Sequence, residues 1–206
     1  DRKESAAYVA EEPRLVRPAN LPPGTPGEGW RVFRAADGTT VGVVSLLGRV
    51  FMKEADCPFR AADRVLTELK DHCQVVFVDF HAETTAEKVA MGWHLDGRAT
   101  VLIGTHTHVQ TADERVLPGG TAFLCDAGMT GGFESVIGME RNAALARFLT
   151  LLPQRLTPAK GDPRLNGALV SVDPATGRAL SIRRLAVPVP AATLPADLRL
   201  LGGEDL

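Results

Sequence analysis

Residues 74–108 read QVVFVDFHAETTAEKVAMGWHLDGRATVLIGTHTH and carry the pattern that is most informative about the fold. They begin with a nearly continuous apolar run, Gln74–Phe80, whose β-branched residues are typical of a strand buried on both faces of a sheet. Residues 84–97, opened by threonine and closed by glycine, predict a helix. The apolar residues 99–104 predict the next buried strand. The stretch as a whole therefore predicts a βαβ unit, in which a helix connects two parallel strands.

Hairpins flank the βαβ unit on both sides. Asp37-Gly38 lies between two short apolar runs and indicates a hairpin turn, and Thr176-Gly177 indicates a second one. The other expected elements are helices over 3–12, 61–70 and about 140–152, the last of them amphipathic, and strands over 30–33, 41–47 and 121–127. Because hairpins occur beside a βαβ unit, the sequence predicts a single α/β domain over residues 1–206, with a mixed sheet packed against helices.

Composition and charge narrow the function classes. The 23 basic and 25 acidic residues leave a net charge of −2, which argues against wrapping long DNA or RNA, whereas a small anion needs only a few local charges. The three cysteines form no CxxC pair, so neither a thiolate metal site nor a redox dithiol is indicated. No signal peptide and no apolar run of membrane-spanning length is found. We therefore expect a cytoplasmic protein that binds neither long nucleic acid nor membrane, and a homo-oligomer is an open alternative.

Three of the five histidines follow the two strands of the βαβ unit. His81 ends the first strand, and His106 and His108 come directly after the second. Side-chain direction alternates along an extended chain, so His106 and His108 would point to the same side. In open α/β sheets, ligands collect beyond the carboxyl ends of the strands, where these histidines are expected. Three imidazoles in one crevice are typical of a site for zinc, iron or manganese.

The role of several polar residues stays open at this point. The two histidines in residues 105–108 could instead cap a loop and bond only to the backbone, and their spacing alone favours neither interpretation. Glu83 has three interpretations: a metal ligand, a carboxylate that orients a ligand, or the N-terminal charge of the next helix. His72 and His94 are treated as ordinary helical histidines and are left out of the site.

Other reaction classes lack their defining motifs. No GxSxG elbow, GxxxxGKS/T loop or HExxH pair occurs, which argues against an elbow-type serine hydrolase, a P-loop nucleotidase and a zincin protease. The glycine-rich segment GMTGG, residues 128–132, follows a predicted strand and could form a phosphate nest. A glycine-rich turn at such a place is more often only a turn.

Three separate motifs carry a family resemblance: FHAETTAEK at 80–88, GTHTHVQTADE at 104–114 and DAGMTG at 126–131. Together they resemble the calcineurin-like metallophosphoesterase superfamily, and specifically its bacterial 2′,3′-cyclic-nucleotide phosphodiesterase branch. The resemblance implies a two-sheet αββα sandwich and a hydrolase that uses two divalent metal ions. Iron or manganese is expected, with zinc as an alternative, and the substrate would be a small phosphodiester or cyclic nucleotide.

The resemblance assigns a role to each of the three histidines. His81 and His106 correspond to ligands of one metal, and His108 corresponds to a ligand of the other. The two ions would activate a water for attack on phosphorus. Candidates for substrate contacts are Thr105, Thr107 and the GMTGG turn.

The resemblance also implies that part of the enzyme is missing from this chain. The family begins with a strand that ends in a Gly-Asp motif and then carries Asn-Gly-Glu-Asn and Gly-Asn-His motifs, and none of these three segments is found in residues 1–206. They supply the other metal ligands and an acid histidine, without which two divalent cations are not neutralised. We therefore expect the C-terminal portion of the enzyme, a sandwich incomplete at its N-terminus and inactive by itself. Whether the chain is an enzyme stays open, because a non-catalytic remnant or an interaction protein is the alternative.

Overall fold

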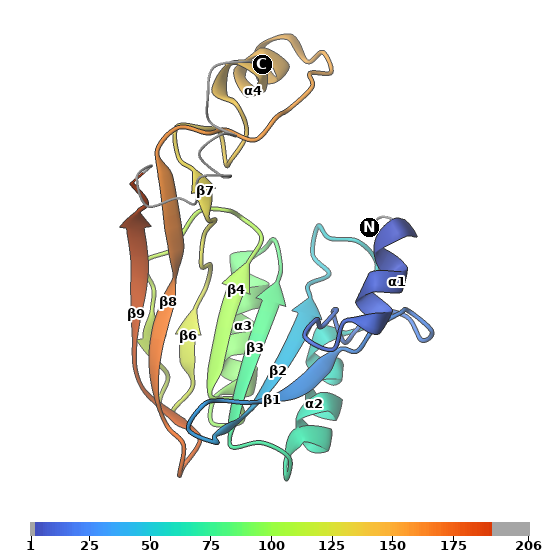
Figure 1. The fold of residues 1–206 in the computed structure, drawn as a ribbon, viewed down its shortest axis with the longest axis vertical. Coiled ribbons are helices and arrows are strands. Elements are labelled where there is room, and N and C mark those ends of the chain that lie inside the picture. Colours follow the sequence, from blue (N-terminus) through green and yellow to red (C-terminus); the bar gives the residue numbers. More distant parts are fainter. Residues whose placement is uncertain (1–2, 191–206) are drawn as a thin grey trace.

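The computed structural model describes residues 3–190, in which two sheets are flanked by helices (Figure 1). This mixed α/β sandwich confirms the fold class that the sequence predicts. In chain order the elements are α1 (Lys3–Glu11), β1 (Trp30–Arg34), β2 (Thr40–Leu47), α2 (Pro58–Leu69), β3 (Val75–His81), α3 (Thr85–Leu95), β4 (Val101–Thr105), β5 (Arg115–Val116), β6 (Ala122–Leu124), β7 (Gly131–Gly132), α4 (Arg141–Thr150), β8 (Pro163–Asp173) and β9 (Arg178–Pro188).

The larger sheet aligns the ends of its parallel strands. Its order is β1-β2-β3-β4-β6-β5, with β2, β3, β4 and β6 parallel and the edge strands β1 and β5 antiparallel to their neighbours. In this register Leu47 of β2 lies beside His81 of β3, and His81 lies beside Thr105 of β4. The carboxyl ends of three parallel strands therefore meet at one end of the sheet, which is where α/β proteins bind their ligands.

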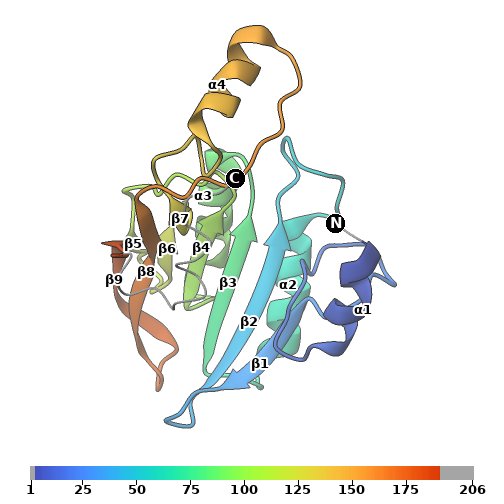
Figure 2. The same cartoon turned by 45° about the horizontal axis from the view of Figure 1, so that its top comes forward.

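The inner strands of this sheet are buried to different extents: β4 is covered on both faces, whereas Phe77, Asp79 and His81, which share one face of β3, are only half-buried. Helices α2 and α3 lie on one face (Figures 1 and 2), where Phe80, Met91 and Leu102 belong to one fully buried cluster. The other face contacts the three-stranded sheet β7-β8-β9, for example through Ile103 against residues such as Ile182. A strand buried on both sides has no polar face, so its sequence does not alternate.

Both predicted hairpins form. In the first, Gly38 has a φ of +91°, a left-handed conformation that glycine adopts without steric cost, and the Asp37 carboxylate accepts the amide N–H of Thr39 at 2.9 Å. The second hairpin joins β8 to β9, and Gly177 in its turn has a φ of +68°. A Cβ at Gly177 would also lie 2.7 Å from the carbonyl oxygen of Gln74, so this turn packs directly against the start of β3.

The proline- and glycine-rich loop before β1 is anchored by one buried side chain. Asn20 is fully buried, and its amide nitrogen donates to the carbonyl oxygens of Leu47 at 2.7 Å and Asp56 at 2.9 Å. Its amide oxygen accepts the N–H of Leu47 at 2.9 Å. A single side chain thus satisfies three backbone groups and fixes the loop against the carboxyl end of β2.

The predicted amphipathic helix over about 140–152 forms as α4, but away from the sandwich. Figures 1 and 2 show it in an arm, residues 133–162, that extends beyond β7. Phe148, Leu149 and Leu151 are 73%, 83% and 87% exposed, and Ala144 is the buried residue of the helix. The apolar stripe of α4 is therefore not covered by the rest of residues 3–190. Within that same range, no helix is long and apolar enough to cross a membrane.

Candidate metal site at the carboxyl ends of the parallel strands

The fold brings two of the three predicted histidines into contact. His81 ends β3 and His106 follows β4, its neighbour in the sheet. The Nε2 atom of His81 lies 3.0 Å from Nδ1 of His106, and the two ring planes are nearly perpendicular, with their centroids 4.7 Å apart. The sequence argument from the carboxyl ends of parallel strands therefore correctly predicted that these two side chains meet.

A carboxylate lies behind each of these two imidazoles. The Nε2 atom of His106 is 2.8 Å from the Glu83 carboxylate. The Nδ1 atom of His81 is 3.1 Å from the Thr105 hydroxyl, which in turn donates to the Asp79 carboxylate at 3.0 Å. Of the three interpretations of Glu83, the structure thus favours the carboxylate that orients a ligand.

These partners determine which ring nitrogens carry protons. The Glu83 carboxylate accepts hydrogen bonds, so it selects a proton on Nε2 of His106. The Thr105 hydroxyl has one proton, which it donates to Asp79, so it must accept the Nδ1–H of His81. The nitrogens left without a proton are Nε2 of His81 and Nδ1 of His106, the two that face each other. With this assignment of protons, both free nitrogens are available as metal ligands, and a metal ion that they share would lie beside the line joining them.

The separation of these two nitrogens tests whether they fit one metal ion. Nitrogens that each lie about 2.1 Å from a metal, on axes about 90° apart, are about 3.0 Å from each other. The separation from Nε2 of His81 to Nδ1 of His106 has this value. Metal-ligating histidines also usually donate their other N–H to a carboxylate or another oxygen acceptor, as both histidines do here. The pair fits two adjacent positions in the coordination shell of one divalent ion.

Burial adjusts the ionisation of this cluster. The pKa of His81 is below its usual 6.5. The main cause is burial of the ring away from water, and the nearby His106 ring lowers the pKa further. A neutral imidazole is the form that binds a metal, so this shift favours ligation. Burial likewise raises the pKa of Asp79, and the hydrogen bond from Thr105 only partly opposes that effect.

His108 lies apart from this pair. The extended backbone that would place His106 and His108 on one side is not found, because β4 ends at Thr105 and the chain turns. His106 has a φ of +118° and His108 a φ of +66°, conformations that cost non-glycine residues roughly 1–3 kcal/mol each. The Nδ1–H of His108 donates to the carbonyl oxygen of Ile137, at 2.8 Å, in the segment that leads to α4.

The three histidines do not converge on a single point. Among residues 3–190, no three His, Cys, Asp or Glu side chains come together as a ready-made metal site. The assignment of His81, His106 and His108 as ligands stays a prediction, with His81 and His106 in one place and His108 in another.

A buried ion pair beneath the histidines escaped the sequence analysis. The Lys88 ammonium on α3 lies 2.9 Å from the Asp126 carboxylate after β6, and the two side chains are 1% and 0% exposed. Burial alone would raise the pKa of Asp126, but the hydrogen bonds from Lys88 and from backbone amides outweigh burial and lower it. The predicted strand over 121–127 ends early for the same reason, because residues after Leu124 turn to place this carboxylate. The only local signal was an aspartate directly after an apolar run.

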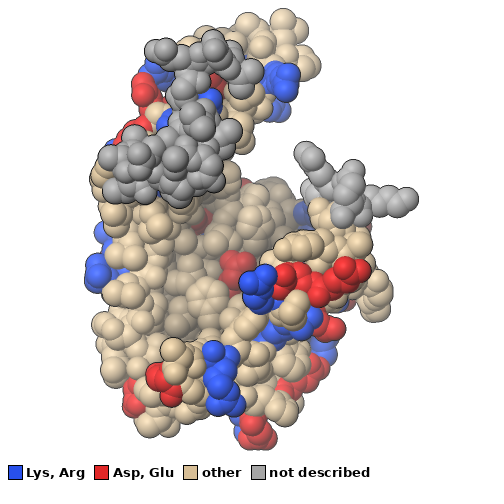
Figure 3. Space-filling view, viewed as in Figure 1, with Lys and Arg blue, Asp and Glu red and all other residues tan. Residues whose placement is uncertain are grey.

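The surface beside the histidines is hollowed. On the face drawn in Figure 3, the hollow next to the ends of β2, β3 and β4 is lined mainly by uncharged side chains. A cavity of about 340 Å³ has His108 in its wall, together with side chains of both polarities: Met129, Phe133, Ile137, Arg164 and Asn166. Of the candidate substrate contacts, Thr105 has its hydroxyl bonded to His81 and Asp79, whereas Thr107 is half-buried and its hydroxyl donates to the carbonyl oxygen of Val109 at 3.3 Å.

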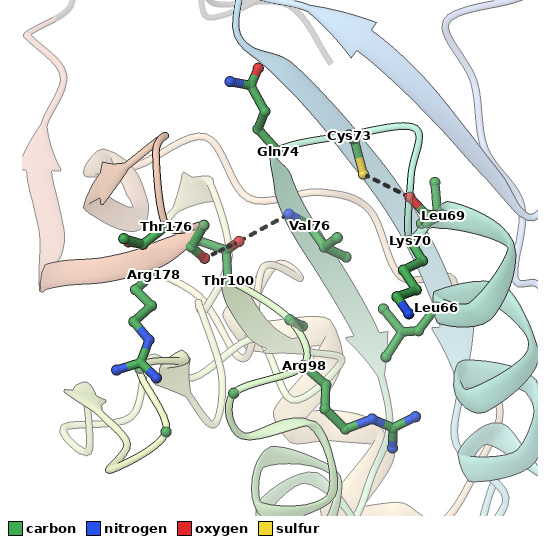
Figure 4. A pocket seen from close by; sticks show the side chains of 15 residues that line it. Leu66, Leu69, Lys70, Cys73, Gln74, Val76, Arg98, Thr100, Thr176 and Arg178 are labelled. Carbon is green, nitrogen blue, oxygen red and sulfur yellow. Dashed lines mark hydrogen bonds between the residues drawn. The ribbon is translucent and has the colours of Figure 1, made fainter.

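A second pocket lies at the opposite end of the strands. It has a volume of about 230 Å³ and is lined by Gln74 before β3, Thr100 before β4 and Arg178 of β9 (Figure 4). The Thr100 hydroxyl accepts the N–H of Val76 at 3.0 Å and donates to the carbonyl oxygen of Gly177 at 2.8 Å, so its polar groups serve the sheet. This pocket is separated from the histidines by the length of β3 and β4.

Comparison with known proteins identifies the family. A model of the family described as YmdB-like protein matches residues 1–185. This chain belongs to the YmdB-like family. A Bacillus subtilis protein named 2′,3′-cyclic-nucleotide 2′-phosphodiesterase is 46% identical over 187 residues, which make up 91% of this chain and 70% of that protein.

Two solved structures are similar to this chain in both fold and sequence. A hypothetical protein from Thermus thermophilus superposes with a TM-score of 0.85 at 43% identity, covering 92% of this chain and 73% of that one. A novel phosphatase from Mycoplasma pneumoniae gives a TM-score of 0.82 at 33% identity, covering 91% and 68%. The chain thus spans about two thirds to three quarters of the length of each of these relatives. The name of the Bacillus subtilis relative agrees with the resemblance to phosphodiesterases seen in the sequence motifs.

Proposed function

We propose that this YmdB-like chain carries the histidine part of a metal-dependent phosphodiesterase that hydrolyses 2′,3′-cyclic nucleotides or related small phosphodiesters. The single observation that carries the proposal is the close approach of Nε2 of His81 and Nδ1 of His106, which are 3.0 Å apart. The name of the Bacillus subtilis relative supports the substrate class. Two divalent ions, when bound, would supply a nucleophilic water at neutral pH and balance the charge of the phosphodiester oxygens.

The chain's own residues would orient the metal ligands. Glu83 holds the Nε2–H of His106, and the Asp79 carboxylate acts through Thr105 to hold the Nδ1–H of His81. Each imidazole is thereby kept in the tautomer that directs its free nitrogen toward the other. The nitrogen separation fits two ligands of one divalent ion, and imidazole ligands suit iron, manganese and zinc alike.

His108 would serve the second ion. Its Nδ1–H is bonded to the Ile137 carbonyl, which leaves Nε2 as its free nitrogen. This role explains why the turn after β4 separates His108 from His106. We propose that the remaining ligands of both ions come from polypeptide outside residues 1–206, because three neutral imidazoles do not balance two divalent charges.

The test compares this chain with a grafted protein. In the grafted protein, residues 1–206 are joined to the part of the Bacillus subtilis relative that the match does not cover. The two parts follow each other in the same order as in that relative. We expect the grafted protein to hydrolyse 2′,3′-cyclic AMP with Mn²⁺ or Fe²⁺. Residues 1–206 alone should bind at most one transition-metal ion weakly and show no appreciable hydrolysis.

Two outcomes would contradict the proposal. Metal-dependent turnover by residues 1–206 alone, abolished by His106→Ala, would mean that the chain needs no further ligands. A grafted protein that binds two Mn²⁺ ions but hydrolyses neither 2′,3′-cyclic AMP nor bis-p-nitrophenyl phosphate would argue against a phosphodiesterase and favour an interaction protein.

A further inference from the structure

The Lys88–Asp126 ion pair lies in an environment that makes it costly. Both side chains are almost completely removed from water, and their charged atoms are 2.9 Å apart. The attraction between two buried charges often only offsets their loss of hydration. Apolar side chains of similar size in their place therefore often give a protein that is equally stable. The pair therefore calls for an explanation in terms of what else it contacts.

The other hydrogen bonds of the pair lead to the histidine turn. The Lys88 ammonium donates to the carbonyl oxygen of Thr105 at 3.4 Å, directly before His106. One Asp126 oxygen accepts the amide N–H of Thr107 at 3.0 Å, and the other accepts that of Gly128 at 2.9 Å. Thr107 is the residue between His106 and His108, so one carboxylate holds the peptide that joins the two candidate ligands.

This peptide is held in a conformation that it would not adopt by itself. The residues on both sides of Thr107 have positive φ angles, +118° at His106 and +66° at His108. Such backbone angles persist in non-glycine residues only where surrounding contacts impose them. The amide N–H between the two strained residues donates to Asp126, so this carboxylate is one of the contacts that hold the turn.

Steric packing restricts the pair to this arrangement. A Cβ at Gly104 would lie 1.8 Å from the carbonyl oxygen of Cys125 and 2.7 Å from Cδ of Lys88. The absence of a side chain at Gly104 thus lets the Lys88 stem pass beneath β4 and lets the chain before Asp126 approach it. Glycine at this position is required first by the Cys125 carbonyl oxygen, and the Lys88 stem passes close to the same space.

We propose that Lys88 and Asp126 form a positioning pair that holds residues 105–108 in the turn in which His106 faces His81. Neither residue is a metal ligand, because both are buried and satisfied by one another and by the backbone. The part that concerns metal binding rests on the proposed function. The part that concerns the turn rests on the contacts alone.

The first experiment measures amide hydrogen exchange in residues 1–206 by NMR, without metal. In Asp126→Ala, the side chain has no acceptor oxygen, so the amide N–H groups of Thr107 and Gly128 both lose the carboxylate that accepts them. We expect exchange at Thr107 to become at least about 10-fold faster, while exchange at Leu102 in the same strand stays within about twofold. Unchanged exchange at both Thr107 and Gly128 would overturn the proposal.

The second experiment separates positioning from stability. Lys88→Met combined with Asp126→Leu removes both charges, so its melting temperature should recover most of what Lys88→Met alone loses. We nevertheless expect fast Thr107 exchange and an Mn²⁺ affinity at least about 10-fold below that of the unmodified chain. Recovery of Thr107 protection and Mn²⁺ affinity together with the melting temperature would show a merely structural role and overturn the proposal.

A matched control comes from the adjacent residue on α3. Glu87 is also buried, and its carboxylate accepts the amide N–H groups of Arg49 at 3.1 Å and Val50 at 3.3 Å. Glu87→Gln should speed exchange at Arg49 and Val50 and leave Thr107 and Mn²⁺ affinity unchanged. The exchange data decide for or against the positioning pair whether or not the unmodified chain binds Mn²⁺, so the proposed function is tested separately by the grafted protein.

Discussion

The carboxyl ends of β3 and β4 and the α4 arm are held in opposite ways. At the strand ends, polar groups lie on a buried foundation, with Asp126 and Lys88 at 0% and 1% exposure beneath His106. In the arm, the apolar side chains are outside, with Leu149 83% exposed. The difference shows that precise placement of polar side chains depends on the core below them, whereas a helix can form without burying its apolar stripe.

The largest contrast between the two regions should appear in turnover. In the grafted protein, His106→Ala should lower kcat/KM for 2′,3′-cyclic AMP by about 100-fold or more, because it removes one of two ligands that fit the same ion. Phe148→Ala in the arm should change it by less than about twofold. Metal content measured alongside turnover checks the cause: a His106→Ala protein that keeps both ions would contradict the ligand assignment.

Ion pairs in the two regions should differ in their effect on folding. Lys88→Met leaves the Asp126 charge buried and unpaired, so we expect it to lower the free energy of unfolding by about 3–5 kcal/mol. The arm pair Arg141–Glu134 is 3.5 Å long with both side chains more than half exposed, so Arg141→Ala should change stability by about 0–1 kcal/mol. Urea denaturation measures the loss in the free energy of unfolding for each variant. Equal losses for Lys88→Met and Arg141→Ala would contradict this prediction.

Leucines in the two regions should also behave differently. Leu102→Ala opens a cavity in the fully buried core and should cost about 2–5 kcal/mol of stability. Leu149→Ala removes an exposed side chain and should stay within about 0.5 kcal/mol. A large loss for Leu149→Ala in residues 1–206 would show that the arm is covered in solution, and the comparison would then need to be redrawn.

The smallest effect is expected in the pH dependence of stability. The folded-state pKa of Asp126 is lowered from 3.8, so its carboxylate contributes stability that is fully present above this value and is lost as pH falls through the lowered one. Asp126→Asn should therefore be less stable at neutral pH and lose less stability on acidification below about pH 4. Thermal unfolding between pH 3 and pH 6 tests this, and parallel curves for the two proteins would contradict it.

The histidine site was only partly predictable from the sequence. The rule that ligands collect at the carboxyl ends of parallel strands correctly predicted that His81 and His106 lie together. Neighbouring parallel strands end at the same edge of a sheet. The period-two rule did not apply to His106 and His108, because it assumes an extended chain and the strand ends at Thr105. Whether Glu83 is a ligand or orients one depended on a 2.8 Å contact that no spacing rule supplies.

Local chemistry was sufficient to predict the βαβ unit, both hairpins and the α/β class. Apolar periodicity, a glycine at each turn and the length of each run act between neighbours in the chain, so they can be recognised without a structure. Three other features emerge only from the packed fold: Lys88 pairs with Asp126, the α4 stripe stays uncovered within residues 3–190, and two imidazole nitrogens lie 3.0 Å apart. These features depend on distances between residues far apart in sequence, 38 positions for Lys88 and Asp126, and such distances are set only when the sheets pack.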